Sequence, residues 1–518
     1  MKHMAAVLIS CLLLTSAVHT ADVQKPNILY ILCDDLGYGD VKVLNPKGKI
    51  ATPALDKLAA GGMIFTDAHG CSSVCTPTRY GIMTGRYSWR SRLQSGVLGG
   101  TSPRLIEDGR MTVATYLKAH GYQTACFGKW HLGMDWAVKE KGAAKAGDAI
   151  EGGKNLQKYD YTKPISNGPT SLGFDRYFGI SASLDMAPFV YIENDHVTAE
   201  PTVEKTFVRK GPAAPDFEAV DVLPKLTQVT IDYLNAFKKS RDANPADAKP
   251  FFIYMPLNSP HAPIVPSKEW QGKSGLNAYG DFVMETDACV GQIIDALDKN
   301  GLAESTLILF TSDNGCSPVA DIPGMEAKGH FANYHFRGMK SDIWDGGHRV
   351  PFIARWAGKV KAGSTSDQTV CLNDLMATCA ELLGEKLPDN AGEDSVSILP
   401  ALLDTAKGAL REATVHHSIS GHFSIRQGNW KLELCSNSGG WSSSKAANKA
   451  DAKTLPKVQL YDMLADVGET KNVQADHPEI VEKLTKLLEK YVADGRSTPG
   501  VPQKNTAPID LWKLGKKQ

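Results

Sequence analysis

The sequence predicts an α/β fold in which a mixed, mostly parallel sheet flanked by helices precedes a smaller C-terminal α+β subdomain on an antiparallel sheet. Two observations support this fold class. Short apolar runs that read as strands buried on both faces alternate with amphipathic helical patterns, which is typical of a parallel sheet. From about residue 405 this alternation ends, and short strand candidates follow one another. We therefore expect a large domain over residues 22–405 and a subdomain over residues 406–518.

Length and charge set the first limits on function. The chain has 518 residues, which is long for one domain and favours one large domain plus a smaller one. Basic and acidic residues number 57 each, so no global electrostatic field attracts nucleic acid or an acidic membrane. Any preference for an anionic substrate must therefore arise from local groups.

The N-terminus has the form of an export signal. An apolar run from Met4 to about Val18 follows a lysine and is too short to span a bilayer. We expect residues 1–21 to be a signal peptide and the protein to be periplasmic or secreted, without a membrane span. Disulfides are then possible among the cysteines other than Cys11 and Cys75, although their pairing cannot be read. The chain lacks an Asn-x-Ser/Thr sequon, which favours a bacterial over a lysosomal protein.

The first buried run, from Asn27 to Cys33, leads into Asp34 and Asp35. Ligands of open α/β sheets bind at the carboxyl ends of the strands. Adjacent carboxylates there are costly to bury without a cation, and oxygen ligands suit a hard divalent ion such as calcium. The alternative for this pair in isolation is a solvated Asp-Asp turn.

The stretch from Cys71 to Arg86 is the centre of the chain's chemistry and contains Cys75-x-Pro77-x-Arg79. Proline suits the first position of a helix, because its missing N–H would have no partner there. This predicts a helix that begins at Pro77, with Cys75 just before it, where backbone N–H groups favour an anion. The alternative is a buried cysteine that precedes a helix and has no chemical role.

Three further buried runs end beside polar side chains. Parallel strands present their carboxyl ends at one edge of a sheet, so we expect these side chains to converge with the first pair of aspartates. A lysine there can hold an anionic oxygen, and a histidine can move protons near neutral pH. The runs and the residues after them are 122–127 with Lys129 and His131, 250–255 with His261, and 306–312 with Asp313 and Asn314.

Amphipathic patterns predict helices between these strands and one near the C-terminus. The predicted helices cover residues 112–120, 225–238, 279–300 and 478–491, and another begins at residue 52. The C-terminal strand candidates are residues 423–426, 430–434 and 458–462. Composition predicts a surface insertion at 137–170, loops at 201–215 and 437–455, and a lid or pocket wall at 316–335.

These motifs resemble those of the type I, formylglycine-dependent sulfatases, in the arylsulfatase and N-acetylgalactosamine-6-sulfatase-like branch. The resemblance implies an alkaline phosphatase-like α/β fold and hydrolysis of sulfate monoesters. It also implies that a maturation enzyme converts Cys75 to formylglycine (3-oxoalanine). The resemblance covers nearly all of the mature chain and is most specific over residues 27–40, 71–86, 128–133, 311–315 and 336–351.

The same resemblance implies a calcium site and a division of catalytic work. One calcium ion is held by Asp34, Asp35, Asp313, Asn314 and the modified residue at position 75. The residues themselves predict repulsion among these carboxylates, and a calcium ion would relieve it.

Sulfate binding and proton transfer fall to basic side chains in this family. The resemblance implies that Lys129 and Lys340 neutralise the sulfate oxygens and that Arg79 helps to hold the formylglycine hydrate. His261 becomes the candidate acid for the leaving alcohol, and His131 the base that regenerates the aldehyde. Those roles describe a sulfatase that attacks sulfur with one hydroxyl of the hydrate.

The substrate is expected to be a sulfated carbohydrate, with sulfated galactose or N-acetylgalactosamine favoured by the branch. Ser183 falls where the family often places a polar group near the sulfate, and Asp185 is a candidate sugar contact. One alternative is a phosphomonoester or phosphonate hydrolase, which usually carries a serine or threonine nucleophile and histidine-rich zinc ligands. Another is an inactive glycan-binding relative, against which the complete catalytic set argues.

Overall fold

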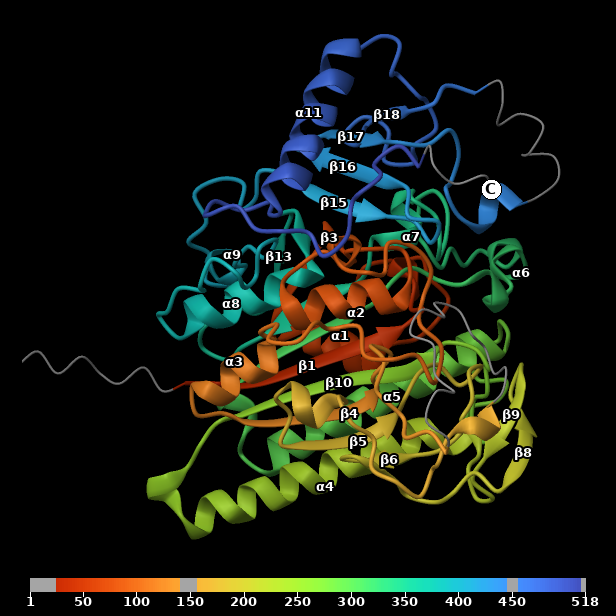
Figure 1. Ribbon diagram of the computed structural model, residues 1–518, viewed down its shortest axis with the longest axis vertical. Helices are drawn as coiled ribbons and strands as arrows, with labels where there is room; N and C mark the ends of the chain where they lie inside the picture. Colours follow the sequence, from red (N-terminus) through yellow and green to blue (C-terminus); the bar gives the residue numbers. More distant parts are fainter. Residues whose placement is uncertain (1–24, 140–155, 445–454, 514–518) are drawn as a thin grey trace, which may run out of the picture.

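The computed structural model describes residues 25–139, 156–444 and 455–513. The predicted signal peptide, the middle of the predicted insertion and residues 445–454 of the predicted loop lie outside the described residues. Figure 1 shows a large sheet in the lower part of the molecule and a small sheet with one long helix above it. The fold class that the sequence predicts is confirmed, and the boundary at residue 405 stays a prediction.

The large sheet has ten strands in the order β13-β2-β12-β11-β1-β10-β4-β5-β6-β7. The four apolar runs form its centre as parallel neighbours, and burial of both faces explains their uninterrupted apolar character. Beyond β4 the sheet continues with the parallel β5 and then the antiparallel β6 and β7. Beyond β11, β12 and β2 each pair antiparallel with the preceding strand, and β13 pairs parallel with β2. The central strands are β11 (Thr306–Ser312), β1 (Asn27–Asp34), β10 (Phe251–Pro260) and β4 (Gln123–Lys129). The outer strands are β13 (Ser364–Ser366), β2 (Met63–Phe65), β12 (Phe352–Arg355), β5 (Arg176–Ile180), β6 (Ile192–Glu193) and β7 (His196–Val197).

Helices pack against this sheet in two groups. The two longest, α4 and α5, contact each other and the central strand β10. A second group, α2, α3 and α8, packs together and holds the cysteine motif. The bounds are α1 (Pro53–Ala60), α2 (Cys75–Thr84), α3 (Val113–Ala119), α4 (Val222–Ala243), α5 (Ala278–Lys299) and α8 (Leu375–Leu382). Within the described ranges, every helix is too short or too polar to cross a lipid bilayer.

The C-terminal subdomain is a four-stranded antiparallel sheet covered by α11 (Pro478–Asp494). The helix buries Leu484, Leu488 and Tyr491 against it, as its amphipathic pattern predicts. Tyr87 and Trp89, just after α2, belong to the same apolar cluster, so the subdomain packs on the segment that follows the cysteine motif. The strands are β15 (Thr414–His417), β16 (Phe423–Gln427), β17 (Trp430–Glu433) and β18 (Gln459–Asp462).

Local predictions differ from the structure at three places. Helix α2 begins at Cys75, before Pro77, because none of the first four N–H groups of a helix has an intrahelical partner and proline is tolerated throughout that turn. The stretch 201–215 contains a hairpin of β8 (Val203–Thr206) and β9 (Lys210–Ala213), whose largely exposed first strand gives no apolar pattern. Strand β15 was not predicted, because its sequence TVHH contains a single strongly apolar residue.

Candidate active site

Three carboxylates meet at the carboxyl edge of the central sheet. In the parallel ladder Cys33 pairs with Ser312, so the next residues, Asp34 and Asp313, emerge side by side. The backbone N–H of Asp35 donates to Oδ1 of Asp313 at 3.2 Å. Asp35 has a φ of 66°, a left-handed conformation that aspartate tolerates and that turns the chain as β1 ends. The predicted convergence of these strand ends is confirmed.

Each carboxylate has its own buried cation. Arg79 donates to Asp313 Oδ2 from Nη2 at 2.7 Å and from Nε at 3.1 Å. Further contacts place Lys129 Nζ 2.5 Å from Asp34 and Lys340 Nζ 2.7 Å from Asp35. Three negative and three positive side chains therefore form one buried, formally neutral cluster. Good geometry of this kind is what makes buried charges tolerable.

Two oxygen atoms in this cluster lack hydrogen-bond donors. Nδ2 of Asn314 donates to Asp35 at 2.8 Å, which leaves its Oδ1 buried and without a partner in the described chain. Oδ1 of Asp34 is likewise buried and has no hydrogen bond from any described residue. Buried polar atoms are nearly always satisfied, so such oxygens are suited to a cation or a water. Carboxylate and amide oxygens are the ligands that calcium prefers.

The electrostatics of the aspartates point in the same direction. Burial and the adjacent Asp34 carboxylate raise the pKa of Asp313 to about 7. Burial also acts against ionised Asp34, but Lys129 and other basic neighbours outweigh it and hold the pKa of Asp34 well below its ordinary value. A divalent cation between the two would favour the ionised form of both. The residues present therefore fit a hard metal ion.

Cys75 opens helix α2 next to these carboxylates. Ligand atoms of Asp34, Cys75 and Asp313 all lie within 4.8 Å of one another. Burial raises the pKa of the Cys75 thiol, so the unmodified side chain stays protonated and is a weak nucleophile. Position 75 therefore lies at a helix N-terminus and beside carboxylates that suit a cation, and its unmodified thiol is unreactive.

Two histidines flank the cluster with different exposures. The side chain of His261 is 10% exposed, its Nδ1 donates to Ala262 O at 2.6 Å, and its Nε2 lies 3.6 Å from Asp35. His131 is fully buried, and its Nε2 donates to Leu98 O at 2.6 Å. That bond leaves Nδ1 of His131 with a lone pair and without a partner among the described residues. Burial lowers the pKa of His131 well below its usual range, so the ring is neutral.

The remaining candidates are Ser183 and Asp185, predicted from the sequence, and one aromatic residue that sequence reasoning missed. Ser183 follows β5, the strand beside β4, and its buried Oγ has no partner in the described ranges. Asp185 instead lies 3.6 Å from Arg209. The missed residue is Trp441, whose ring centroid lies 6.0 Å from Lys340 Nζ and which is 39% exposed. An aromatic residue within a Gly- and Ser-rich loop was the available signal.

Comparison with known proteins gives a consistent result. A family model described as "Sulfatase" matches residues 26–385. An N-acetylgalactosamine-6-O-sulfatase of Bacteroides thetaiotaomicron is 32% identical over 505 residues, covering 90% of this chain and 93% of that protein. Human arylsulfatase A is 31% identical over 521 residues, covering 95% of this chain and 93% of the relative.

A solved structure gives the same result at the level of the fold. This structure comes from work on the metabolism of multiple glycosaminoglycans by Bacteroides thetaiotaomicron. It superposes on this chain with a TM-score of 0.76 at 31% sequence identity. The match covers 90% of this chain and 99% of that one.

Proposed function

The chain belongs to the sulfatase family and is a sulfuric ester hydrolase, and from this premise we propose that it removes sulfate from glycans at the cluster around Cys75. The observation that carries the proposal is the convergence of three carboxylates, three cations and Asn314 beside the first residue of α2. Fixed positive charge in a buried site stabilises the charge that builds up as a sulfate ester breaks.

The nucleophile in this proposal is position 75 after conversion of the cysteine to formylglycine by a maturation enzyme. A protonated, buried thiol is a poor nucleophile, whereas a hydrated aldehyde offers two hydroxyls on one carbon. One hydroxyl attacks sulfur and the other allows the product to collapse with release of sulfate. Conversion to formylglycine would explain why the site contains a cysteine whose thiol is buried and protonated and therefore unreactive.

Asp34, Asp35, Asp313 and Asn314 would hold a calcium ion together with position 75. The support is the oxygen donor set and the two buried oxygens that lack donors. When bound, the ion supplies positive charge to the nucleophile and to the sulfate. Arg79 keeps Asp313 in place through two bonds and holds the Lys129 backbone through a third, from Nη1 at 3.0 Å.

The remaining side chains bind sulfate and move protons. Lys129 and Lys340 would each exchange part of their contact with an aspartate for a sulfate oxygen. Nδ1 of His131 carries a free lone pair and would accept a proton from the second hydroxyl. His261 lies at the more exposed side of the cluster, where its Nε2 can protonate the departing alcohol.

The substrate we favour is a sulfated galactose or N-acetylgalactosamine unit in an exported glycan, met in the periplasm or outside the cell. Support comes from the N-acetylgalactosamine-6-O-sulfatase relative and from the predicted signal peptide. Trp441 beside Lys340 offers an aromatic face of the kind that sugars stack on. Phosphomonoester hydrolysis is disfavoured, because the cluster contains a cysteine and oxygen ligands rather than a serine and histidine ligands.

The test is an assay of matured protein on a panel of sulfated monosaccharides, an aryl sulfate and an aryl phosphate. We expect turnover of the sulfate esters, fastest on N-acetylgalactosamine or galactose 6-sulfate. Faster hydrolysis of the phosphate than of every sulfate would overturn the assignment. Binding of sulfated glycans without any turnover, by protein whose residue 75 is shown by mass to be formylglycine, would identify an inactive relative instead.

A further inference from the structure

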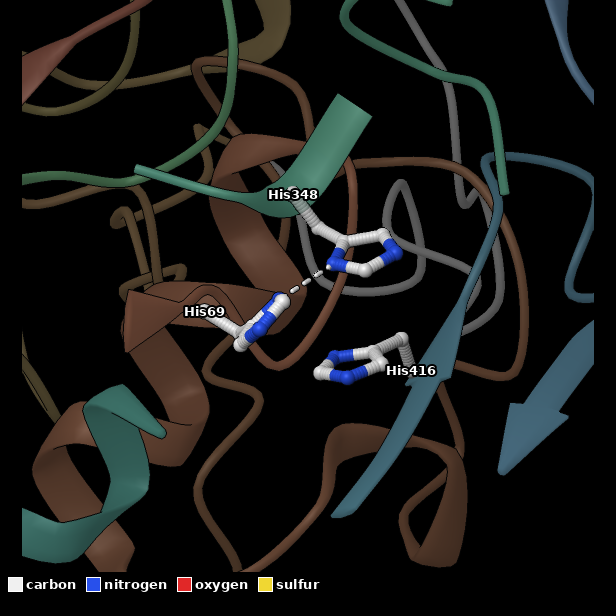
Figure 2. A group of neighbouring side chains, drawn as sticks. All are labelled: His69, His348 and His416. Atoms are coloured by element: carbon white, nitrogen blue, oxygen red, sulfur yellow. Dashed lines mark hydrogen bonds between the residues drawn. The ribbon is translucent and has the colours of Figure 1, made fainter. Parts of the chain in front are cut away.

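A second cluster of buried ligand atoms lies outside the candidate active site. It joins His69 on β3 (Ala68–His69), His348 on α7 (Asp345–His348) and His416 on β15 (Figure 2). All three side chains are fully buried. One ligating nitrogen of each ring lies within 4.8 Å of those of the other two. Three distant segments of the chain therefore deliver imidazoles to one point.

One nitrogen of each ring faces an oxygen that can only accept a hydrogen bond. Such a nitrogen must carry the ring's proton, so the other nitrogen of a neutral ring carries a lone pair. These contacts are His69 Nε2 to Asp67 Oδ1 at 3.0 Å, His348 Nε2 to Ile343 O at 3.0 Å, and His416 Nδ1 to Gly70 O at 2.9 Å. Arg426 Nη1 also lies 3.4 Å from His69 Nε2, but its shorter contact, at 2.8 Å, is the bond that it donates to Asp67 Oδ1.

The remaining nitrogens conflict with one another if nothing lies between them. Nδ1 of His69 and Nδ1 of His348 are 3.1 Å apart, so two lone pairs face each other at hydrogen-bond distance. Nε2 of His416 is buried and has no partner in the part of the chain that the structure describes. An extra proton or a metal cation relieves this arrangement, whereas the other tautomer of His69 would let its Nδ1 donate to His348 but would turn the Nε2 lone pair toward the Asp67 carboxylate at 3.0 Å.

An extra proton is the less favourable solution. It would place a positive charge on rings that are fully buried, and moving a charge out of water is costly. The ammonium of Lys431 repels such a charge, and the carboxylate of Asp345, which would attract it, is already paired with Lys431 at 2.9 Å. Neutral rings with inward lone pairs are what a metal ion requires.

The geometry points to a transition metal. Zinc binds imidazole at 2.0–2.1 Å with tetrahedral angles, which places two ligating nitrogens roughly 3.3 Å apart. The observed separation of the His69 and His348 nitrogens is 3.1 Å. Ligating histidines also donate their other N–H to a carboxylate or a backbone carbonyl, as all three do here. We propose that His69, His348 and His416 bind a divalent metal ion of the zinc class.

The position of this site indicates a structural role. His69 precedes the loop that leads to Cys75, whereas His416 belongs to the sheet of the C-terminal subdomain. A shared ion would tie the subdomain to the base of the nucleophile loop. In the structure His416 stacks on His348 with ring centroids 4.0 Å apart and planes 11° apart. Coordination by all three rings therefore tilts His416 out of this stack.

The primary experiment measures zinc in the full mature protein, purified without a histidine tag. After loading with a zinc salt and gel filtration, we expect about one zinc ion per chain by mass spectrometry. His348→Gln and His416→Gln should lose this ion. His417→Gln is the matched control, because it changes the next residue of β15, which is equally buried and lies on the opposite face of the strand.

A second measurement does not depend on any variant folding. X-ray absorption at the zinc edge of the loaded wild-type protein should show nitrogen ligands at about 2.0–2.1 Å. The proposal is overturned if the wild-type protein retains no zinc, if the zinc has only oxygen ligands, or if folded histidine variants keep it. In those cases the cluster is a hydrogen-bonded group of histidines that shares a buried proton.

Discussion

The candidate active site and the histidine cluster are two buried groups of ligand atoms built around one short stretch of chain. Cys75 belongs to the first and His69 to the second. The first is made of carboxylate and amide oxygens, each carboxylate paired with a cation. The second is made of neutral rings whose outer N–H groups are fixed by acceptors. The proposed calcium and zinc ions would thus be separated by ligand type, although the two sites lie close together along the chain.

The two clusters also differ in their proposed roles, which are catalysis for the first and stabilisation of the fold for the second. The oxygen cluster lies beside the proposed nucleophile, and its lysines are proposed to exchange contact with an aspartate for contact with a substrate oxygen. The histidine cluster is fully buried, and its proposed ion links the segment before the nucleophile to the C-terminal sheet. Loss of a side chain from the active-site cluster should therefore stop turnover, whereas loss of a histidine from the histidine cluster should lower the stability of the fold.

The largest effect is expected from Cys75→Ser, made in a host that does not oxidise that serine. A serine has one hydroxyl, so it can attack sulfur but cannot collapse the resulting ester through a second hydroxyl. We expect no repeated turnover and a slow gain in mass equal to one SO3 group, because the serine oxygen becomes the ester oxygen and the alcohol leaves. Intact-mass spectrometry after incubation with substrate measures this gain, alongside product release. Multiple turnovers by the serine variant would rule out the hydrate mechanism.

Asp313→Ala should also remove turnover, since it deletes a proposed calcium ligand. It leaves Arg79 buried without its main partner, which can cost about 3–5 kcal/mol of stability. Asp313→Asn therefore serves as the better-folded companion, because it keeps the shape and one oxygen. Calcium content and thermal unfolding are measured on both variants. A folded Asp313→Asn protein with unchanged calcium content and activity would remove Asp313 from the site.

Lys340→Ala should reduce kcat on a sulfate ester by on the order of 10²–10³, as loss of one electrostatic donor typically does. Lys340 is buried and contacts Asp35, so its charge acts in a site from which water is excluded. Lys486 pairs with Glu482 on the exposed face of α11, and Lys486→Ala is the control. Similar small effects of the two changes on kcat would mean that Lys340 does not bind sulfate.

Much of the oxygen cluster could be predicted from the sequence because each residue follows an apolar run. Local patterns identify buried strands, and parallel packing brings their carboxyl ends to one edge. Asp34, Lys129, His261 and Asp313 were placed together by that reasoning alone. Lys340 was different: it lies in a loop without periodicity, so only the resemblance to sulfatases identified it.

The histidine cluster could not be predicted, because no local pattern links its members. His348 stands on a one-turn helix and His416 on a strand that was not recognised. A single histidine is more often a hydrogen-bonded structural residue than a ligand. The proximity of Cys71 and Cys371, whose sulfurs are 3.8 Å apart, could not be predicted for the same reason. Such contacts depend on tertiary packing, which a linear sequence does not display.

The smallest effect, and the sharpest separation of the two clusters, is expected from removing zinc alone. At zinc concentrations about 100-fold above the dissociation constant, the bound ion should raise the melting temperature of the wild-type protein by about 2–3 °C. His348→Gln should abolish this shift and leave kcat unchanged, because His348 belongs to neither the proposed calcium ligands nor the sulfate-binding lysines. Differential scanning calorimetry with and without zinc, in constant calcium, measures the shift, and His417→Gln should retain it. A loss of kcat in folded His348→Gln protein would show instead that the cluster positions the nucleophile loop, and the separation of the two clusters would fail.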